Sequence, residues 1–216
     1  MRSPEPDFDA LRAAMVRRQM RDVTDPAVLE AMARVPRHLF VPPELARRAY
    51  EDRPLEIGLG QTISQPYIVA YMIQAARVGP GDKVLEVGTG SGYQAAVLAE
   101  LGCRVFSVEI LPELHERAAR NLARAGYQGR VRLRLGDGRE GWPEEAPFDA
   151  ILVSAAPEEI PPALPDQLAE GGRLLVPLGP GPTQELVLVE RRGDTFRRRR
   201  LLPVRFVPLL GGGEEA

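Results

Sequence analysis

The amino-acid sequence predicts an α/β protein: a mostly parallel sheet with helices on both faces, antiparallel strands at its C-terminal edge, and a helical appendage at the N-terminus. Three observations support this fold class. Short apolar runs alternate with helical patterns between residues 84 and 176, as consecutive βαβ units require. Residues 185–202 read as two strands around Gly193-Asp194, which indicates a hairpin. The segment before residue 77 is mainly helical in pattern.

Local signals place the individual elements. A first helix precedes Asp25-Pro26, which supplies an N-cap and a first-turn proline for a second helix. The proline-rich segment 35–43 ends that helix, and residues 65–76 form an amphipathic one. The expected strands of the sheet are 84–87, 104–108, 131–135, 148–153 and 172–176, with 185–191, 195–202 and 204–209 at its edge. The expected helices between the strands are 94–101, 112–125 and 161–168.

We expect one domain over residues 1–216, because a chain of this length with 44% hydrophobic residues can fill one substantial core. A helical appendage with an active-site loop occupies residues 1–76. The cofactor-binding core follows at 77–180, and residues 181–216 form the C-terminal antiparallel strands and a tail.

Composition narrows the classes of function. The net charge of −2 gives no general reason to expect binding to nucleic acid or to a membrane surface. The single cysteine, Cys103, excludes an internal disulfide, and its separation from His38 and His115 argues against a metal site. No apolar run reaches the ~20 residues of a membrane span, and the acidic, proline-bearing start is unlike a signal sequence. We therefore expect a cytoplasmic monomer without a metal ion.

A glycine-rich turn between a strand and a helix is the main functional signal. Residues 84–93, VLEVGTGSGY, read as a buried strand that ends in this turn and opens a helix. Glycines leave bare backbone for a ligand, and the helix start offers free N–H groups to a carboxylate or phosphate. The early third glycine and the preceding acid are typical of S-adenosyl-L-methionine-dependent methyltransferases rather than of dinucleotide-binding folds. The candidate cofactor residues here are Glu86, Gly88, Thr89, Gly90, Ser91 and Gly92.

Acidic residues also follow the next two strands. Glu109 ends the second strand, where a carboxylate can accept hydrogen bonds from both ribose hydroxyls of a nucleoside. Asp137 follows the third strand, beside Gly138, and could reach the exocyclic amine of adenine. Because open α/β sheets bind ligands at the carboxyl ends of their strands, these positions together predict one S-adenosyl-L-methionine site.

The residues after the fourth strand restrict the methyl acceptor. Enzymes that methylate exocyclic base amines usually carry an Asn- or Asp-Pro-Pro-aromatic motif there, whereas this chain has SAAP at 154–157. Cys103 lies at the wrong end of its strand to attack a pyrimidine carbon. We therefore expect an acceptor that needs no deprotonation, such as a carboxylate. In the segment 58–66, GLGQTISQP, Ser64 is placed to cap the following helix and to offer its hydroxyl to a carboxylate.

From Val35 to Pro208 the chain resembles the protein-L-isoaspartate O-methyltransferases, which repair abnormal L-isoaspartyl residues in aged proteins. The matching segments are VPRHLFVP, GQTISQP, VLEVGTGSGYQAA, VFSVE, GDG, APFDAILVSAAPEEIP, GGRLLVPLG and VRFVPL. The resemblance implies a Rossmann-like sheet, S-adenosyl-L-methionine as donor, S-adenosyl-L-homocysteine as product, and a methyl ester that closes to a succinimide. It also implies roles for residues outside the glycine turn: Ser64 in the active site, Gln61 and Thr62 at the cofactor, and Ile57 and Val207 at the substrate.

Three other functions stay open at this point. A methyltransferase of the same fold could act on RNA or a small molecule, and a nicotinamide oxidoreductase would use a related glycine turn. The run Arg197–Arg200 suggests a third alternative, a nucleic-acid-binding protein without enzymatic activity. Because four successive strand residues place two side chains on each face, a solvated edge guarded against pairing is the simpler explanation of this run.

Overall fold

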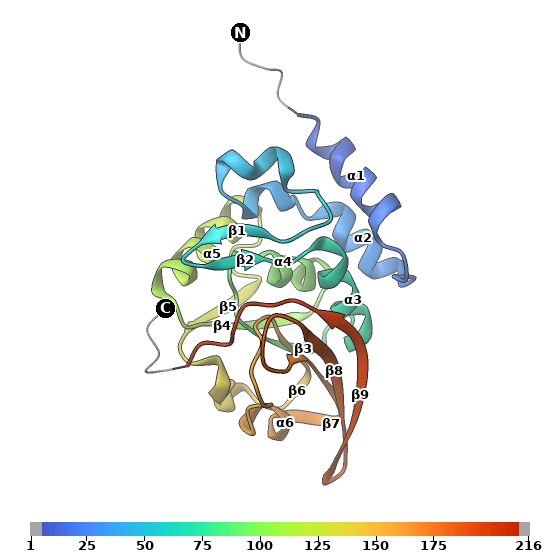
Figure 1. Ribbon diagram of the computed structural model, residues 1–216, viewed down its shortest axis with the longest axis vertical. Coiled ribbons are helices and arrows are strands. Elements are labelled where there is room, and N and C mark those ends of the chain that lie inside the picture. The colour runs from blue at the N-terminus through green and yellow to red at the C-terminus, as the bar shows by residue number, and fades with distance from the viewer. Residues whose placement is uncertain (1–5, 212–216) are drawn as a thin grey trace.

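The computed structural model describes residues 6–211, and within that range its main sheet has seven strands in the order β5-β4-β3-β6-β7-β8-β9 (Figure 1). The strands from β5 to β7 are parallel, whereas β8 and β9 continue the sheet in antiparallel fashion. Their bounds are Lys83–Val87 (β3), Arg104–Glu109 (β4), Val131–Leu135 (β5), Phe148–Val153 (β6), Leu168–Leu178 (β7), Gln184–Arg192 (β8) and Thr195–Val204 (β9). The predicted fold class is confirmed, while residues 212–216 of the expected tail lie outside the described range.

Both faces of the central strands β3, β4 and β6 are buried, which explains why these strands are mostly apolar. Leu85 and Val87 point into one hydrophobic cluster, whereas Val84 belongs to the other. The helices that pack on the face of Val84 are α3 (Pro66–Ala76), α4 (Tyr93–Glu100) and α5 (Pro112–Arg124). The opposite face is covered by α6 (Ala163–Asp166) and by short turns that include η3 (Gly138–Glu140) and η4 (Pro143–Glu145).

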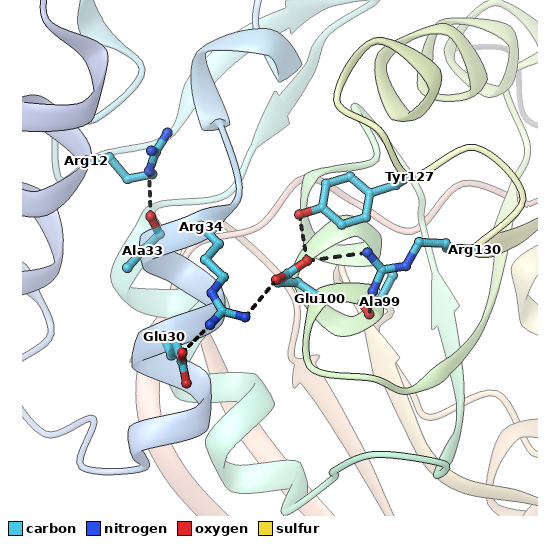
Figure 2. A network of polar contacts seen from close by, with 8 residues as sticks. All are labelled: Arg12, Glu30, Ala33, Arg34, Ala99, Glu100, Tyr127 and Arg130. Atoms are coloured by element: carbon cyan, nitrogen blue, oxygen red, sulfur yellow. Dashed lines mark hydrogen bonds and ion pairs between the residues drawn. The ribbon is translucent and has the colours of Figure 1, made fainter.

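The N-terminal helices attach to this core through a polar network (Figure 2). They are α1 (Phe8–Gln19), α2 (Pro26–Arg34), η1 (Arg37–Phe40) and η2 (Pro43–Arg48). Arg12 on α1 donates to the Ala33 carbonyl on α2 at 2.6 Å. Arg34 then pairs with Glu100 on α4 at 3.3 Å, and Glu100 also accepts a hydrogen bond from Tyr127 at 3.1 Å. The network thus links the appendage to the helix that follows the glycine turn.

Two predicted elements differ in length from those observed. The helix expected at 161–168 is reduced to α6 at 163–166, because Pro165 has no N–H for the Pro161 carbonyl and its ring would clash with that carbonyl in a helix that began at 161. The following strand, expected at 172–176, instead extends from Leu168 to Leu178 as β7.

The segment after β9 is not the edge strand that the sequence predicted. β9 ends at Val204, and the chain then crosses the carboxyl ends of the parallel strands (Figure 1). Pro208 forms an isolated parallel bridge with Ala156, where the Ala156 N–H donates to the Val207 carbonyl at 2.7 Å. The prediction of a strand over 204–209 was therefore wrong. Proline at 208 cannot donate a ladder hydrogen bond, so regular pairing cannot continue through it.

A two-stranded sheet before α3 was not predicted. It consists of β1 (Leu55–Gly58) and β2 (Gln61–Ile63), which pair in antiparallel fashion around a two-residue loop. Leu59 and Gly60 in that loop have φ values of 56° and 67°, as primed hairpin turns require. Strands of three and four residues are too short for their alternation to be recognised in the sequence.

The structure bears on three of the earlier expectations. Arg197–Arg200 are all exposed on β9, which is an edge strand, so their charges hinder pairing with another sheet. No helix within residues 6–211 has the length and apolar character needed to cross a membrane. The same part of the chain contains no cluster of three or more His, Cys, Asp or Glu residues that could hold a metal ion.

Candidate active site

A cavity with about 770 Å³ of empty space, part of it open to solvent, lies at the carboxyl ends of the central strands. The predicted cofactor residues that line it are Gln61, Thr62, Glu86, Gly88, Thr89, Gly90, Ser91, Glu109 and Gly138. The structure therefore brings together residues that the sequence indicated in four separate segments.

The glycine turn combines ligand access with close packing. Gly88 and Gly92 both have a φ of 88° and Gly90 has a φ of 54°, which are left-handed conformations that favour glycine. Gly88 and Gly90 line the cavity, but Gly92 does not. A Cβ on Gly92 would lie 3.3 Å from Leu122 on α5, so this glycine allows helix packing. Because α4 begins directly after Gly92, its positive end borders the cavity and favours an anionic ligand group there.

Glu109 is held in the cavity wall by two backbone groups. The Gly90 N–H donates to its Oε2 atom at 2.8 Å, and the Leu111 N–H donates to its Oε1 atom at 3.0 Å. The side chain is buried but lines the cavity. Since each carboxylate oxygen can accept more than one hydrogen bond, both oxygens keep capacity for a pair of ligand hydroxyls.

A chain of buried hydrogen bonds runs beneath the glycine turn. Ser107 Oγ donates to Glu86 Oε2 at 2.5 Å, and Gln94 Nε2 donates to Glu86 Oε1 at 3.1 Å. The hydroxyls of Thr89 and Ser107 lie 2.6 Å apart. Burial raises the pKa of Glu86 to about 8, although the hydrogen bonds from Ser107 and Gln94 act in the opposite direction. Burial therefore favours the protonated form of Glu86, whereas a cationic ligand nearby would favour its ionised form.

Asp137 and Gly138 follow β5 and have different surroundings. Gly138 lines the cavity, and a Cβ at this position would lie only 2.4 Å from Val87 Cγ1, so close packing against β3 requires glycine. Asp137 is not among the lining residues. Its carboxylate accepts a hydrogen bond from the Arg139 N–H at 2.9 Å and pairs with the Arg139 guanidinium at 2.7 Å. A contact between Asp137 and adenine stays a prediction.

Ser64 lies where the cavity meets a second, outer groove. The groove has about 1100 Å³ of empty space, including the part open to solvent, and also borders α3 and the end of β9. The predicted capping role of Ser64 is wrong. The N-cap of α3 is Gln65, which has extended backbone and no side-chain capping bond, and the helix begins at Pro66. Ser64 therefore does not cap α3, and it lines both spaces.

A buried arginine that was not predicted from the sequence holds the backbone of Ser64. Arg37 is fully buried, and it donates to the carbonyls of Ser64 and Ala49, each at 2.7 Å. Its guanidinium lies 4.6 Å from the centroid of the Tyr93 ring. Burial lowers the pKa of Arg37 to about 10, so the side chain keeps its charge at neutral pH. A basic residue in a proline-rich segment is usually exposed, which is why sequence reasoning missed Arg37.

We expect Arg37→Met to lower the free energy of unfolding by about 2–4 kcal/mol, because two buried carbonyls lose their donor. Arg37→Lys should cause a smaller loss, since lysine keeps the charge but lacks the planar fork that serves both carbonyls. Urea unfolding measures both effects, with Arg124→Met on the exposed surface of α5 as the control. Equal stability of the wild type and the Arg37→Met variant would contradict the prediction.

The two residues predicted to bind a substrate lie in different environments. Ile57 on β1 is buried and is not among the residues that line the cavity or the groove. A Cβ on Gly90 would lie 3.5 Å from Ile57 Cδ1, so Ile57 supports the glycine turn. Val207 lines both the cavity and the groove, and the Ala156 N–H holds its carbonyl.

Several lining residues escaped the sequence reading. They are Tyr93, Gln94, Ser154, Leu209 and Leu210, among others. Gln94 and Ser154 are 60 positions apart, and no spacing rule relates a residue of the first helix turn to a residue after the fourth strand. The available sequence signal was that Gln94 follows the glycine turn and that Ser154 follows a buried strand.

Comparisons with known proteins found similar sequences over most of the chain. The family model described as "Protein-L-isoaspartate(D-aspartate) O-methyltransferase (PCMT)" matches residues 12–214. A relative from Gloeobacter violaceus, named protein-L-isoaspartate O-methyltransferase, is 60% identical over 190 residues, which are 88% of this chain and 92% of the relative. A relative of the same name from Methylorubrum populi is 56% identical and covers 94% of this chain and 97% of its own length.

A solved structure is similar over nearly the whole chain. It is a protein-L-isoaspartate O-methyltransferase from Plasmodium falciparum in complex with S-adenosyl-L-homocysteine. The TM-score is 0.81 at 27% identity, and the match covers 95% of this chain and 99% of the other.

Proposed function

This chain belongs to the protein-L-isoaspartate(D-aspartate) O-methyltransferase family, and from that premise we propose that it methylates the free α-carboxylate of L-isoaspartyl residues in damaged proteins and peptides. The observation that carries the proposal is the position of Ser64, where the inner cavity meets the outer groove. A methyl donor in the cavity and an extended peptide in the groove would meet at its hydroxyl. S-adenosyl-L-methionine is the donor and S-adenosyl-L-homocysteine the product.

The residues that line the inner cavity support S-adenosyl-L-methionine as its ligand. Gly88 and Gly90 offer bare backbone, and the start of α4 favours the carboxylate of the methionine part. Glu109 has acceptor capacity for the ribose hydroxyls. Leu111 and Leu114, which line the same end of the cavity, provide apolar surface for the adenine ring.

The chemistry needs positioning rather than proton transfer. When bound, S-adenosyl-L-methionine supplies a methyl group whose carbon bonds to a carboxylate oxygen while the carbon–sulfur electron pair stays on sulfur. An isoaspartyl α-carboxylate has an unperturbed pKa of about 3.5–4 and is already ionised at neutral pH, so no general base is required. Ser64 donates a hydrogen bond to this carboxylate and holds it in line, and alignment of this kind contributes ~7–11 kcal/mol to lowering the barrier.

The product explains how methylation starts a repair. A methyl ester is a better leaving group than a carboxylate, so the following backbone nitrogen displaces methanol and closes a succinimide without the enzyme. Hydrolysis of the succinimide returns part of the population to normal aspartate. Selectivity against normal aspartate rests on the extra main-chain methylene of isoaspartate, which the outer groove would have to accommodate. Contacts of Ile57 and Val207 with the peptide are part of this proposal.

The test is transfer of labelled methyl groups to two peptides that differ only in L-isoaspartate or L-aspartate at one position. We expect base-labile label in the isoaspartyl peptide alone. Ser64→Ala should lower kcat/KM about 10–100-fold, because a hydrogen bond to a charged acceptor contributes ~1.5–3 kcal/mol. Labelling of neither peptide by a protein that still binds S-adenosyl-L-methionine would contradict the proposed acceptor, and RNA would then be the next acceptor to test.

We also propose that the protein is a cytoplasmic monomer that binds neither nucleic acid nor membranes and unfolds as one unit. The net charge of −2 supports the absence of a general affinity for polyanions. Light scattering after gel filtration measures the oligomeric state, and retention on immobilised DNA at low salt measures the affinity for nucleic acid. Cell fractionation tests the location, and a single denaturant transition followed by two probes tests the cooperative unit.

A further inference from the structure

Ser154 lies directly after β6, at the same opening as Ser64. Its N–H donates to the Val87 carbonyl at 2.8 Å, which anchors its backbone to β3 beside the glycine turn. A Cβ on Gly88 would lie 3.7 Å from Ser154 Cβ, so the two residues pack closely. Ser154 lines both the inner cavity and the outer groove, and so do Ser64 and Thr62. Ser154 thus lies between the cavity proposed for the methyl donor and the groove proposed for the methyl acceptor.

The hydrogen bonds around Ser154 define what its hydroxyl can still do. Gln94 Nε2 donates one hydrogen to Ser154 Oγ at 3.0 Å and the other to Glu86 Oε1 at 3.1 Å. The Ser154 oxygen therefore acts as an acceptor in this bond, and its own hydrogen is not used there. No acceptor for that hydrogen is found within residues 6–211. Gln94 and Glu86 are buried, so they hold the hydroxyl firmly while its hydrogen remains available to a ligand.

We propose that Ser154 donates a second hydrogen bond to the substrate α-carboxylate, alongside Ser64, and that Gln94 is the positioning residue that orients Ser154; this inference rests on the proposed function. A carboxylate has two oxygens, and two hydroxyl donors can hold both. With one oxygen held by each serine, the carboxylate cannot rotate away from the methyl group. Ser154 would then touch the reacting group and be a catalytic residue, although residues 154–157 do not form an amine-binding motif.

The hydrogen bond from Ser154 is assigned to the carboxylate of the substrate rather than to the carboxylate of S-adenosyl-L-methionine. The glycine turn and the start of α4 already offer backbone N–H groups to the latter inside the cavity. Ser154 also faces the outer groove, which the glycine turn does not line. Its loss should therefore affect the binding of the peptide and leave the affinity for S-adenosyl-L-homocysteine unchanged.

The experiment measures KM and kcat for the isoaspartyl peptide at saturating S-adenosyl-L-methionine, and the dissociation constant of S-adenosyl-L-homocysteine by calorimetry. For Ser154→Ala we expect KM to rise about 10-fold, which is the size of one hydrogen bond to a charged acceptor. The dissociation constant should stay within twofold. Ser154→Thr keeps the hydroxyl and should keep KM near the wild-type value. Thr195→Val removes a hydroxyl from the distant β8–β9 hairpin and serves as the control.

The role of Gln94 is tested by combining substitutions. Gln94→Met removes both donor hydrogens at similar length, and we expect it to raise KM for the peptide about 3–10-fold. If Gln94 affects the peptide by orienting Ser154, adding Gln94→Met to Ser154→Ala should raise KM no further. A full additional increase in the double variant would overturn the positioning role, because a purely structural effect would persist without the hydroxyl.

Two outcomes overturn the assignment of Ser154. An unchanged KM in Ser154→Ala, with the wild type active on the isoaspartyl peptide, would mean that the hydroxyl does not hold the substrate. A 10-fold weaker binding of S-adenosyl-L-homocysteine with unchanged KM would assign the hydroxyl to the cofactor instead. Failure of the wild type itself to label the isoaspartyl peptide would instead overturn the proposed function, and this inference with it.

Discussion

Glu109→Gln should weaken the binding of S-adenosyl-L-methionine about 100-fold, which corresponds to about 2.7 kcal/mol. The carboxylate of Glu109 already accepts the N–H groups of Gly90 and Leu111, and we propose that it also accepts the ribose hydroxyls. Hydrogen bonds to a charged acceptor contribute ~1.5–3 kcal/mol each. An amide has one acceptor atom and would direct N–H donors at one of the two backbone N–H groups. Glu109→Gln would therefore weaken the ribose contacts and disturb the shape of the glycine turn.

Isothermal titration with S-adenosyl-L-homocysteine and S-adenosyl-L-methionine measures this effect. Glu113→Gln is the matched control, because Glu113 is exposed on the first turn of α5 and lies outside the cavity lining. Circular dichroism and urea unfolding verify that the variant is folded. A change of less than threefold in both dissociation constants would show that Glu109 orders the turn without holding the ribose.

Glu86 should make the protein less stable as the pH rises from 4.5 towards 8. Burial raises the pKa of Glu86 from its ordinary value of 4.5 to about 8, with Glu109 adding to the increase and Ser107 and Gln94 opposing it. Between these pH values the folded protein holds a proton that the unfolded chain has released. The stability contribution is therefore complete below pH 4.5 and is lost as the pH rises through that window, at ~1.4 kcal/mol per pH unit.

The measurement is urea unfolding of the wild type and of Glu86→Gln at about pH 5, 6.5 and 8. For each protein the free energy of unfolding is plotted against pH, and the difference between the two slopes isolates Glu86 from other titrating groups. We expect the variant to lose this part of the pH dependence and to become relatively more stable at the highest pH. Glu44→Gln, an exposed position on η2, is the control. Parallel stability curves for the wild type and Glu86→Gln would mean that Glu86 is ionised in the folded protein.

The sequence was sufficient wherever the signal lies between near neighbours. The apolar runs and caps predicted the order of strands and helices, and Asp25 caps α2 as its position before Pro26 indicated. The glycine turn and Glu109 were predicted to lie at neighbouring strand ends because a strand end and the turn after it are continuous in the chain, and β3 and β4 are indeed paired. The family motifs indicated the methyl acceptor and an active-site role for Ser64. These features depend on local backbone geometry, which a short stretch of residues determines.

Tertiary packing alone decided how distant segments complete the site. It buried Arg37 behind Ser64, and it placed Gln94 against Ser154 and Glu86. It also laid residues 205–209 across the strand ends, where the sequence had predicted an edge strand. The physical reason is that a buried polar group takes whichever partner the fold brings within hydrogen-bond distance, and that partner has no fixed separation along the chain.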